Sequence, residues 1–204
     1  HRGCIPTKAY LHAAETVSAA SAYAPGLPAA FDRRAMYERK NKLVDTLTGG
    51  IATLLKGAKV AVYEGVGTLA NAQAPFQVRV TGNDGGTQAL TGRHVLLATG
   101  SAPARLLVPG CDSPAVWTSD DLLAEAGAEP FGSLLIVGGG VIGVEMACVY
   151  ARLGVAVTIL EMEKRCLPML DTELGRSAEL LLKGLGVTVL TGARLQTLER
   201  TGAG

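Results

Sequence analysis

Closely spaced cysteines are missing from this sequence. Its 204 residues contain four cysteines, at positions 4, 111, 148 and 166, and no two of them are close enough to form a C-x-x-C pair. Such a set argues against a small secreted scaffold held together by disulfides. The sequence also shows no signal peptide and no initiator methionine. We therefore expect a cytoplasmic protein whose natural chain extends beyond both ends of this sequence.

Clusters of like charge are missing as well. Lys plus Arg number 19 and Asp plus Glu number 18, which gives a net charge of +1. This balance argues against binding to nucleic acid or to an anionic membrane surface. The apolar stretch 134–160 has the length of a membrane helix, but it contains several glycines together with Glu145 and Arg152. A strand–helix–strand unit explains this composition better than a membrane span.

That stretch is the part of the sequence with the clearest local pattern. The apolar run 134–137 predicts a strand buried on both faces. A glycine cluster follows, and the apolar spacing over 141–153 predicts a helix. A second strand is expected over 155–160, and it ends on Glu161. This order is the context that a dinucleotide-binding fingerprint requires.

The glycine cluster has the spacing of that fingerprint. Gly138, Gly140 and Gly143 form G-x-G-x-x-G. In such a motif the first glycine permits a tight turn and the second lets the backbone approach a pyrophosphate. The third lets the helix lie close to the strand, so that the amides at the helix start face the phosphates. The sequence therefore predicts nucleotide binding at this turn.

The rest of the pattern predicts alternating helices and strands in a chain long enough for two domain-sized pieces. Asp32, Thr118 and Asp171 are the candidate N-caps, and Gly57 is a candidate helix stop. We expect helices over 4–20, 33–55, 119–126 and 171–183, a loop over 21–30, a turn over 83–86, and strands over 60–63, 76–80, 95–98, 186–190 and 194–199. An apolar stripe on the long helix is expected to pack into a core: Met36, Leu43, Val44, Leu47, Ile51, Leu54 and Leu55.

Cys4 and Lys8 form a second group with chemical potential. Cys4 lies at the predicted start of a helix, where the helix dipole favours a thiolate. Lys8 follows four residues later, so both side chains project from one face of the helix. A thiolate beside a cation is the arrangement that activates sulfur. Taken alone, Cys4 also fits a small buried apolar residue.

Three motifs in one order resemble the flavin disulfide reductases, the pyridine nucleotide-disulfide oxidoreductase family. They are Gly-Cys-Ile-Pro-Thr-Lys at 3–8, Ala-Thr-Gly-Ser at 98–101 and Gly-Gly-Gly-Val-Ile-Gly-Val-Glu at 138–145. The text at 40–51 is similar to the dihydrolipoamide dehydrogenase branch more than to glutathione or mercuric reductases. The resemblance covers essentially the whole sequence.

The resemblance implies an α/β fold with two Rossmann-like, doubly wound nucleotide-binding domains and a small β-meander, both domains being incomplete. Residues 1–115 would be the central part of an FAD-binding domain, with the redox-cysteine helix, the long helix and the meander. Residues 116–204 would be the first part of an NAD-binding domain. The family's N-terminal FAD fingerprint, distal FAD segment and interface domain with its His-Glu base lie outside this sequence.

The resemblance also implies catalytic roles for three residues. Cys4 matches the redox cysteine nearer the flavin, and its disulfide partner would precede His1. Lys8 matches a lysine close to flavin N5, and Glu145 matches the glutamate that pairs with it. A carboxylate turned toward Lys8 would keep the ammonium charged. Glu145 also has a simpler explanation, because an acid early in a helix is favourable anyway.

The remaining matched positions are cofactor contacts. Gly67, Thr99, Gly100 and Ser101 match backbone positions that line the FAD. Positions that match contacts to the NAD pyrophosphate are Gly138, Gly139, Gly140, Val141, Ile142, Gly143 and Glu145. Glu161 matches the acceptor for the adenine ribose hydroxyls. Leu195 corresponds less securely to a residue near the adenine, and as a strand residue it also fits a core position.

We expect the pyridine nucleotide to be NAD. A carboxylate at Glu161 repels a 2′-phosphate, and no arginine adjoins it. Lys164 and Arg165 come later, behind a second acid at Glu163. We expect no metal site, and none of His1, His12 and His94 matches the family's catalytic histidine. Cys111, Cys148 and Cys166 receive no role, although Cys148 fits a buried helix thiol.

The implied activity is that of an FAD-dependent oxidoreductase, which moves electrons from dihydrolipoamide through a cysteine pair and the flavin to NAD. Its implied partners are a lipoyl-bearing protein or a small disulfide substrate, and a second copy in a homodimer. The 204 residues alone are expected not to turn over. Two alternatives stay open: a related disulfide or mercuric reductase, and a non-catalytic nucleotide-binding module.

Overall fold

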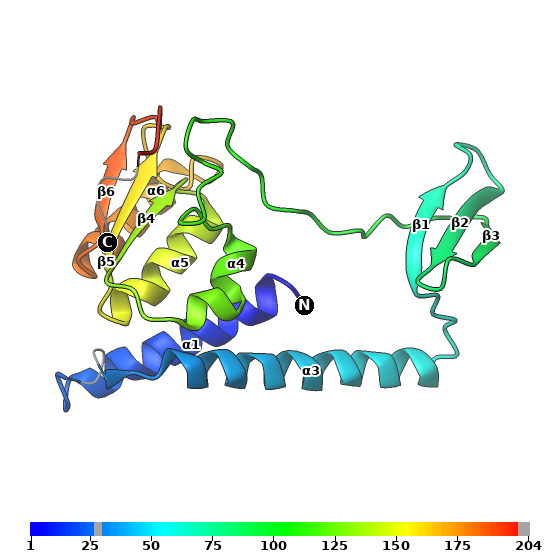
Figure 1. Cartoon of the computed structure of the whole chain (residues 1–204), viewed down its shortest axis with the longest axis horizontal. Helices are drawn as coiled ribbons and strands as arrows, with labels where there is room; N and C mark the ends of the chain where they lie inside the picture. Colours follow the sequence, from blue (N-terminus) through cyan, green and yellow to red (C-terminus); the bar gives the residue numbers. More distant parts are fainter. Residues whose placement is uncertain (27–29, 200–204) are drawn as a thin grey trace. The chain divides into compact units, whose positions relative to one another are not determined.

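The computed structural model describes residues 1–26 and 30–199 and divides the chain into two compact units. One consists of His1–Thr46 and Pro103–Gly204, and we call it the parallel unit. The other is Leu47–Ala102, which we call the meander unit. Figure 1 shows the elements of each unit. The assignment of 1–115 and 116–204 to FAD- and NAD-binding domains stays a prediction.

The parallel unit contains a three-stranded parallel sheet in the order β4-β5-β6. Its strands are β4 (Ser133–Val137), β5 (Ala156–Glu161) and β6 (Thr188–Thr191). The crossover helices are α5 (Val141–Arg152) and α6 (Thr172–Gly184), as drawn in Figure 1. Parallel neighbours need such crossovers, and the regular β-α-β-α-β order supplies them. The strand–helix–strand prediction around the glycine cluster is therefore confirmed.

Strand β4 is partly buried on one face and exposed on the other, which corrects the expectation of burial on both. Leu134 and Ile136 pack against the hydrophobic core that α5 and β5 share. Leu135 and Val137 point to the opposite face and are 49% and 41% exposed. Successive side chains of a strand alternate between faces, and the described helices cover only the first of them.

Helix α1 (Cys4–Ser21) confirms the helix predicted over 4–20, and it packs along α5. Its buried side chains are Pro6, Thr7, Tyr10, Ala14 and Val17. Helix α3 (Arg33–Gly57) follows, and the Asp32 carboxylate accepts a hydrogen bond from the amide of Ala35 at 3.0 Å. Asp32 is thus the N-cap and Gly57 the end, both as predicted. Residues 27–29 of the loop expected over 21–30 lie outside the described residues.

The apolar stripe predicted to pack into a core along α3 is mostly exposed. Of its seven residues, Met36 alone is buried in the structure. The large side chains of Leu43, Leu47, Ile51 and Leu54 are all exposed. Amphipathic spacing identifies a face that is suited to burial, but burial also requires a neighbouring element. The described elements of the two units leave this face accessible.

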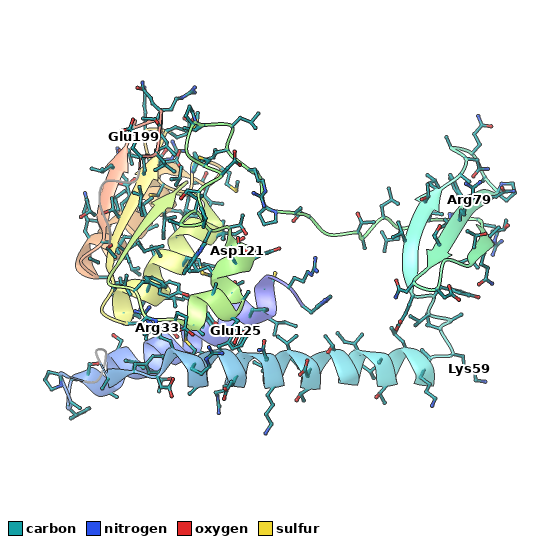
Figure 2. All side chains as sticks on the ribbon, in the orientation of Figure 1. Arg33, Lys59, Arg79, Asp121, Glu125 and Glu199 are labelled. Atoms are coloured by element: carbon teal, nitrogen blue, oxygen red, sulfur yellow. The ribbon has the colours of Figure 1, made fainter. Side chains whose placement is uncertain are left out.

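The start of α3 is tied to the segment that precedes β4. Arg33 donates a hydrogen bond to the carbonyl oxygen of Phe131 at 3.1 Å, and its guanidinium lies 4.5 Å from the centroid of that ring. Arg34 forms ion pairs with Glu125 and Glu129. Figure 2 shows Arg33 and Glu125 close together where these elements meet. These contacts fix α3 beside the short helices before β4.

Those short helices are α4 (Ser119–Leu123) and the 3-10 helix η1 (Glu125–Ala128). Thr118 and Asp121 form a reciprocal capping box at the start of α4, which confirms Thr118 as the N-cap. The helix expected over 119–126 is therefore shorter, because the backbone changes to the tighter 3-10 turn after α4. Asp171 precedes α6 as predicted, but its side chain makes no capping hydrogen bond.

The meander unit contains the antiparallel sheet β1-β2-β3. Its strands are β1 (Gly65–Leu69), β2 (Phe76–Gly82) and β3 (Thr87–Gly92). The turn expected over 83–86 is confirmed, because the Gly82 amide donates to the carbonyl oxygen of Gly86 at 2.8 Å. The meander implied by the family resemblance is thus present.

Three predicted strands are wrong. The strand expected over 60–63 is displaced to β1, and 95–98 and 194–199 are irregular in the described structure. Leu96 is 89% exposed, so the segment 95–98 is not buried either. An apolar run becomes a strand only when another strand pairs with its backbone, and the described chain offers these segments none.

The overall result is an α/β chain with one parallel and one antiparallel sheet, as the sequence predicted. Within residues 1–26 and 30–199, no helix has both the length and the apolar character needed to cross a membrane.

Candidate functional site

The glycine turn between β4 and α5 has the geometry that its spacing predicts. Gly138 has a φ of +111°, a conformation that is open to glycine and strained for other residues. Its amide donates to the carbonyl oxygen of Leu160 at 2.8 Å, which joins the turn to β5. A Cβ on Gly143 would overlap the carbonyl oxygen of Gly138. The third glycine therefore allows the close approach of helix and strand, as predicted.

The space in front of this turn is open. A Cβ built on Gly140 would meet no atom within 4 Å. Gly140 is also the N-cap of α5, so the amides of Val141, Ile142 and Gly143 belong to the first turn of the helix. First-turn amides have no partner within the helix, and they form the positive end of its dipole. The turn thus fits a pyrophosphate, which would meet exposed N–H donors and no obstructing side chain.

Glu161 holds the turn from the end of β5. Its side chain is buried, and Oε2 accepts the amide of Gly139 at 2.6 Å. Oε1 accepts the amide of Glu163 at 2.7 Å. A carboxylate has about four acceptor sites, so about two remain for another donor. Sequence reasoning gave Glu161 a ribose-binding role and did not identify its hydrogen bond to the turn.

The segment 162–170 packs directly on the turn. The amide of Leu167 donates to the carbonyl oxygen of Gly139 at 2.8 Å. A Cβ on Gly139 would lie 2.8 Å from the sulfur of Cys166. Burial, together with the negative charges of Glu179 and Glu161, raises the pKa of the Cys166 thiol to about 11. Cys166 is therefore a buried, neutral thiol beneath the turn, a position that no motif in the sequence signals.

The Arg165 side chain forms hydrogen bonds within the same segment. Its Nη2 donates to the carbonyl oxygens of Pro168 at 3.0 Å and Leu170 at 3.1 Å. These hydrogen bonds use the Arg165 side chain to stabilise the loop to which it belongs. This geometry is relevant to the choice of nucleotide, because Arg165 is one of the two cations that follow Glu161 in the sequence.

Lys8 and Glu145 form an ion pair between α1 and α5. The Lys8 side chain is 64% exposed and that of Glu145 is 23% exposed. Exposed pairs contribute little to stability, so the main effect of this one is to fix where the ammonium lies. The pairing expected for Glu145 is present in the structure, while its role beside a flavin stays a prediction.

Cys4 lies one helical turn before Lys8, at the exposed start of α1. Its thiol is free in the structure. The helix is confirmed here, so Cys4 and Lys8 share a face as predicted. Cys148 is buried in α5, and burial raises the pKa of its thiol. This agrees with the expectation of a buried helix thiol.

The structure groups only part of the predicted site. Gly138 to Gly143, Glu145, Glu161, Cys4 and Lys8 all belong to the parallel unit. Gly67 lies in β1, and Thr99, Gly100 and Ser101 lie in an irregular stretch of the meander unit. All four of these residues are exposed. Leu195 follows β6 in irregular structure and is half-buried, so it is not the strand residue that we expected.

Two curated relatives are both named dihydrolipoyl dehydrogenase. A dihydrolipoyl dehydrogenase of Bacillus subtilis is 36% identical over 206 residues, which cover 96% of this chain and 43% of the relative. A dihydrolipoyl dehydrogenase of Mycobacterium tuberculosis is 35% identical over 207 residues, covering 98% of this chain and 43% of the relative. The chain therefore spans less than half the length of these curated relatives.

Solved structures agree on the fold. LpdA from Mycobacterium tuberculosis matches with a TM-score of 0.83 at 27% identity, covering 100% of this chain and 44% of that one. The HOCl-induced flavoprotein disulfide reductase RclA from Escherichia coli matches with a TM-score of 0.74 at 29% identity, covering 96% and 40%.

A family match extends over nearly the whole sequence. Residues 1–203 match the pyridine nucleotide-disulphide oxidoreductase family, which confirms the resemblance based on the three motifs. The glycine turn on α5 and the cysteine helix α1 that packs against it are the structural counterparts of two of those motifs. The chain belongs to the pyridine nucleotide-disulphide oxidoreductase family.

Proposed function

We propose that this chain supplies the NAD-binding turn and the flavin-side cysteine helix of an FAD-dependent oxidoreductase of the dihydrolipoamide dehydrogenase type. The observation that carries the proposal is that one helix, α5, serves both sites. Its first turn begins at the open glycine turn, and Glu145 on the same helix pairs with Lys8 of the cysteine helix. A nucleotide at the turn and the thiol of Cys4 would therefore share a single scaffold.

NAD is the pyridine nucleotide that this turn suits best. The buried carboxylate of Glu161 disfavours a 2′-phosphate and keeps lone pairs that could accept ribose hydroxyls. The guanidinium of Arg165, a positive charge that follows Glu161 in the sequence, donates hydrogen bonds to carbonyl oxygens of its own loop. The guanidinium of Arg165 is thus already engaged by the loop that packs on the pyrophosphate cradle.

The cysteine helix provides a second set of roles. When bound, FAD would supply the redox chemistry that links a dithiol to NAD. Cys4 presents its thiol at the exposed start of α1, one helical turn before Lys8 and on the same face of the helix. Glu145 holds the Lys8 ammonium in place, and Gly67, Thr99, Gly100 and Ser101 are proposed to line the flavin.

The test is an anaerobic visible absorption spectrum of the protein expressed from its complete gene, before and after addition of NADH. A long-wavelength charge-transfer absorbance would support a thiolate at Cys4 next to a flavin, and Cys4→Ser should remove that absorbance while the flavin stays bound. Flavin bleaching without this absorbance would contradict the disulfide mechanism. Dihydrolipoamide turnover by the Cys4→Ser variant would contradict the role of Cys4.

A non-catalytic nucleotide-binding module is the second candidate. It is favoured by one observation: the glycine turn, α5 and Glu161 are complete within the parallel unit, whereas the proposed flavin-lining residues belong to the other unit. NADH binding by a protein that takes up no flavin would support this candidate. Activity toward another disulfide or mercuric ion, but not lipoamide, would instead indicate a related reductase.

The proposed enzyme would act in the cytoplasm as a homodimer on a lipoyl-bearing protein or a small disulfide. The lipoyl substrate is supported by the names of the curated relatives, which are dihydrolipoyl dehydrogenases. The homodimer is proposed from the family resemblance, and the cytoplasmic location from the lack of closely spaced cysteines. Size-exclusion chromatography with light scattering of the protein expressed from its complete gene tests the dimer.

A further inference from the structure

We infer that Glu179, on α6, is a positioning residue for the dinucleotide-binding turn. It contacts no part of the turn itself and acts through the segment 162–170. The inference rests on the proposed NAD-binding role of the turn. No motif in the sequence gives Glu179 a role.

Gly139 is the residue of the turn that the segment 162–170 contacts. Its amide donates to Glu161 at 2.6 Å, and its carbonyl oxygen accepts the amide of Leu167 at 2.8 Å. Its Cα lies against the sulfur of Cys166. Both backbone polar groups of Gly139 are therefore held from outside the turn, one by Glu161 itself and the other by the segment that follows it. The direction in which the neighbouring amides face depends on these contacts.

The segment is held in an unfavourable backbone conformation at Leu167. Its φ is +51°, in the left-handed region that a bulky residue rarely adopts. Such a conformation persists only when surrounding contacts enforce it. Leu167 is also the residue that donates to Gly139, so relaxation at this position would withdraw the hydrogen bond from the turn.

Helix α6 supplies the contacts that enforce this conformation. Glu179 Oε1 accepts the amide of Cys166 at 2.9 Å, immediately before Leu167. One helical turn earlier, Gly175 is buried, and a Cβ there would lie 2.8 Å from the carbonyl oxygen of Cys166. Residues four apart share a helix face, so Glu179 holds the amide of Cys166 while Gly175, which lacks a side chain, lets the same face of α6 lie close to its carbonyl oxygen. The chain of contacts runs from Glu179 through Cys166 and Leu167 to Gly139.

Two substitutions of Glu179 distinguish the effect of its side-chain length from the effect of its charge. Glu179→Asp keeps the charge but withdraws the carboxylate by one methylene group, away from the Cys166 amide. Glu179→Gln keeps the reach and an acceptor oxygen but removes the charge. Glu173→Gln is the matched control, because Glu173 is an exposed acid on the same helix.

The experiment is an anaerobic fluorescence titration with NADH of the purified protein expressed from its complete gene, with hydrogen exchange of the Leu167 amide measured in parallel. We expect Glu179→Asp to weaken NADH binding about three- to tenfold and to accelerate this exchange, as loss of one hydrogen bond predicts. Glu179→Gln and Glu173→Gln should match the unmodified chain in both measurements.

Each contrary outcome has a distinct meaning. Unchanged affinity in Glu179→Asp would overturn the inference, as would equal weakening by Glu179→Gln. Weaker binding with unchanged exchange at Leu167 would overturn the proposed route through the segment. Failure of the unmodified chain to bind NADH would overturn the proposed function of the turn, independently of how the variants behave.

Discussion

Alanine substitutions at Gly140 and Gly143 should separate nucleotide binding from folding. The two glycines belong to one motif but have opposite surroundings. A methyl group on Gly143 overlaps the carbonyl oxygen of Gly138 and lies 3.2 Å from Cγ2 of Ile136, so α5 and β4 must move apart. A methyl group on Gly140 meets nothing within 4 Å.

The expected magnitudes follow from these surroundings. Overpacking of this kind costs about 1–3 kcal/mol, and in a chain of this size each kcal/mol lowers the Tm by about 2–4 °C. Gly143→Ala should therefore lower the Tm by about 2–12 °C. For Gly140→Ala, a less favourable N-cap opposes the reduced entropy of the unfolded chain, and both effects are below about 1 kcal/mol. Its Tm should stay within about 3 °C of the unmodified chain.

Affinity should follow a different order. The methyl group of Gly140→Ala would occupy the open space through which the proposed nucleotide's pyrophosphate would approach the helix amides. We expect it to weaken NADH binding about tenfold or more, which corresponds to about 1.4 kcal/mol. The assay combines thermal unfolding monitored by circular dichroism with NADH titration at a temperature where both variants are folded. Unchanged affinity in Gly140→Ala would refute the argument that the nucleotide lies over this glycine, and an unchanged Tm in Gly143→Ala would refute the packing argument.

Three further predictions concern the turn and the thiols. Glu161→Ala leaves the amides of Gly139 and Glu163 without their acceptor, which costs about 1–3 kcal/mol at the buried Gly139 amide and less at the part-buried amide of Glu163. Urea denaturation should show the loss, and an unchanged midpoint would contradict the structure. Burial raises the pKa of the Cys166 thiol from 9.0 to about 11, so the folded state holds the thiol proton more tightly than the unfolded state. The stability that this proton binding contributes is complete below pH 9 and is lost as the pH rises toward 11. The unfolding midpoint should therefore fall over this range less steeply in Cys166→Ala than in the unmodified chain, and equal slopes would exclude the effect. At pH 8, a thiol reagent should modify exposed Cys4 rapidly and buried Cys166 only upon unfolding, as mass spectrometry of the labelled peptides would show; rapid labelling of Cys166 would contradict its burial.

The strand–helix–strand unit was predictable because its local and tertiary signals coincide. The apolar run of β4, the glycine spacing and the apolar face of α5 all require the same packing, and the structure contains it. The capping residues Asp32 and Thr118 were predictable for a similar reason, since a cap acts on amides two or three residues away.

Features that depend on distant neighbours were not predictable from local pattern. The runs 60–63 and 95–98 have the composition of strands, but composition does not specify a partner for their backbone groups. The stripe on α3 shows a similar limit, because periodicity identifies an apolar face without identifying what covers it. In the site, the ion pair of Lys8 with Glu145 followed from a family resemblance, whereas the contacts of Cys166 and Glu179 depend on the fold of a loop.

Helix α5 has one more consequence, because it fixes the distance between the glycine turn and Glu145. Gly140 is the N-cap of the helix, and Glu145 follows five residues later, about 7.5 Å along its axis. One residue inserted between them would leave the glycine turn in place and rotate Glu145 by about 100° around the axis, away from Lys8. The number of residues between the glycine turn and Glu145 therefore matters as much as their identity. An insertion or deletion within it would separate the glycine turn from the ion pair with Lys8, although every residue of both would still be present.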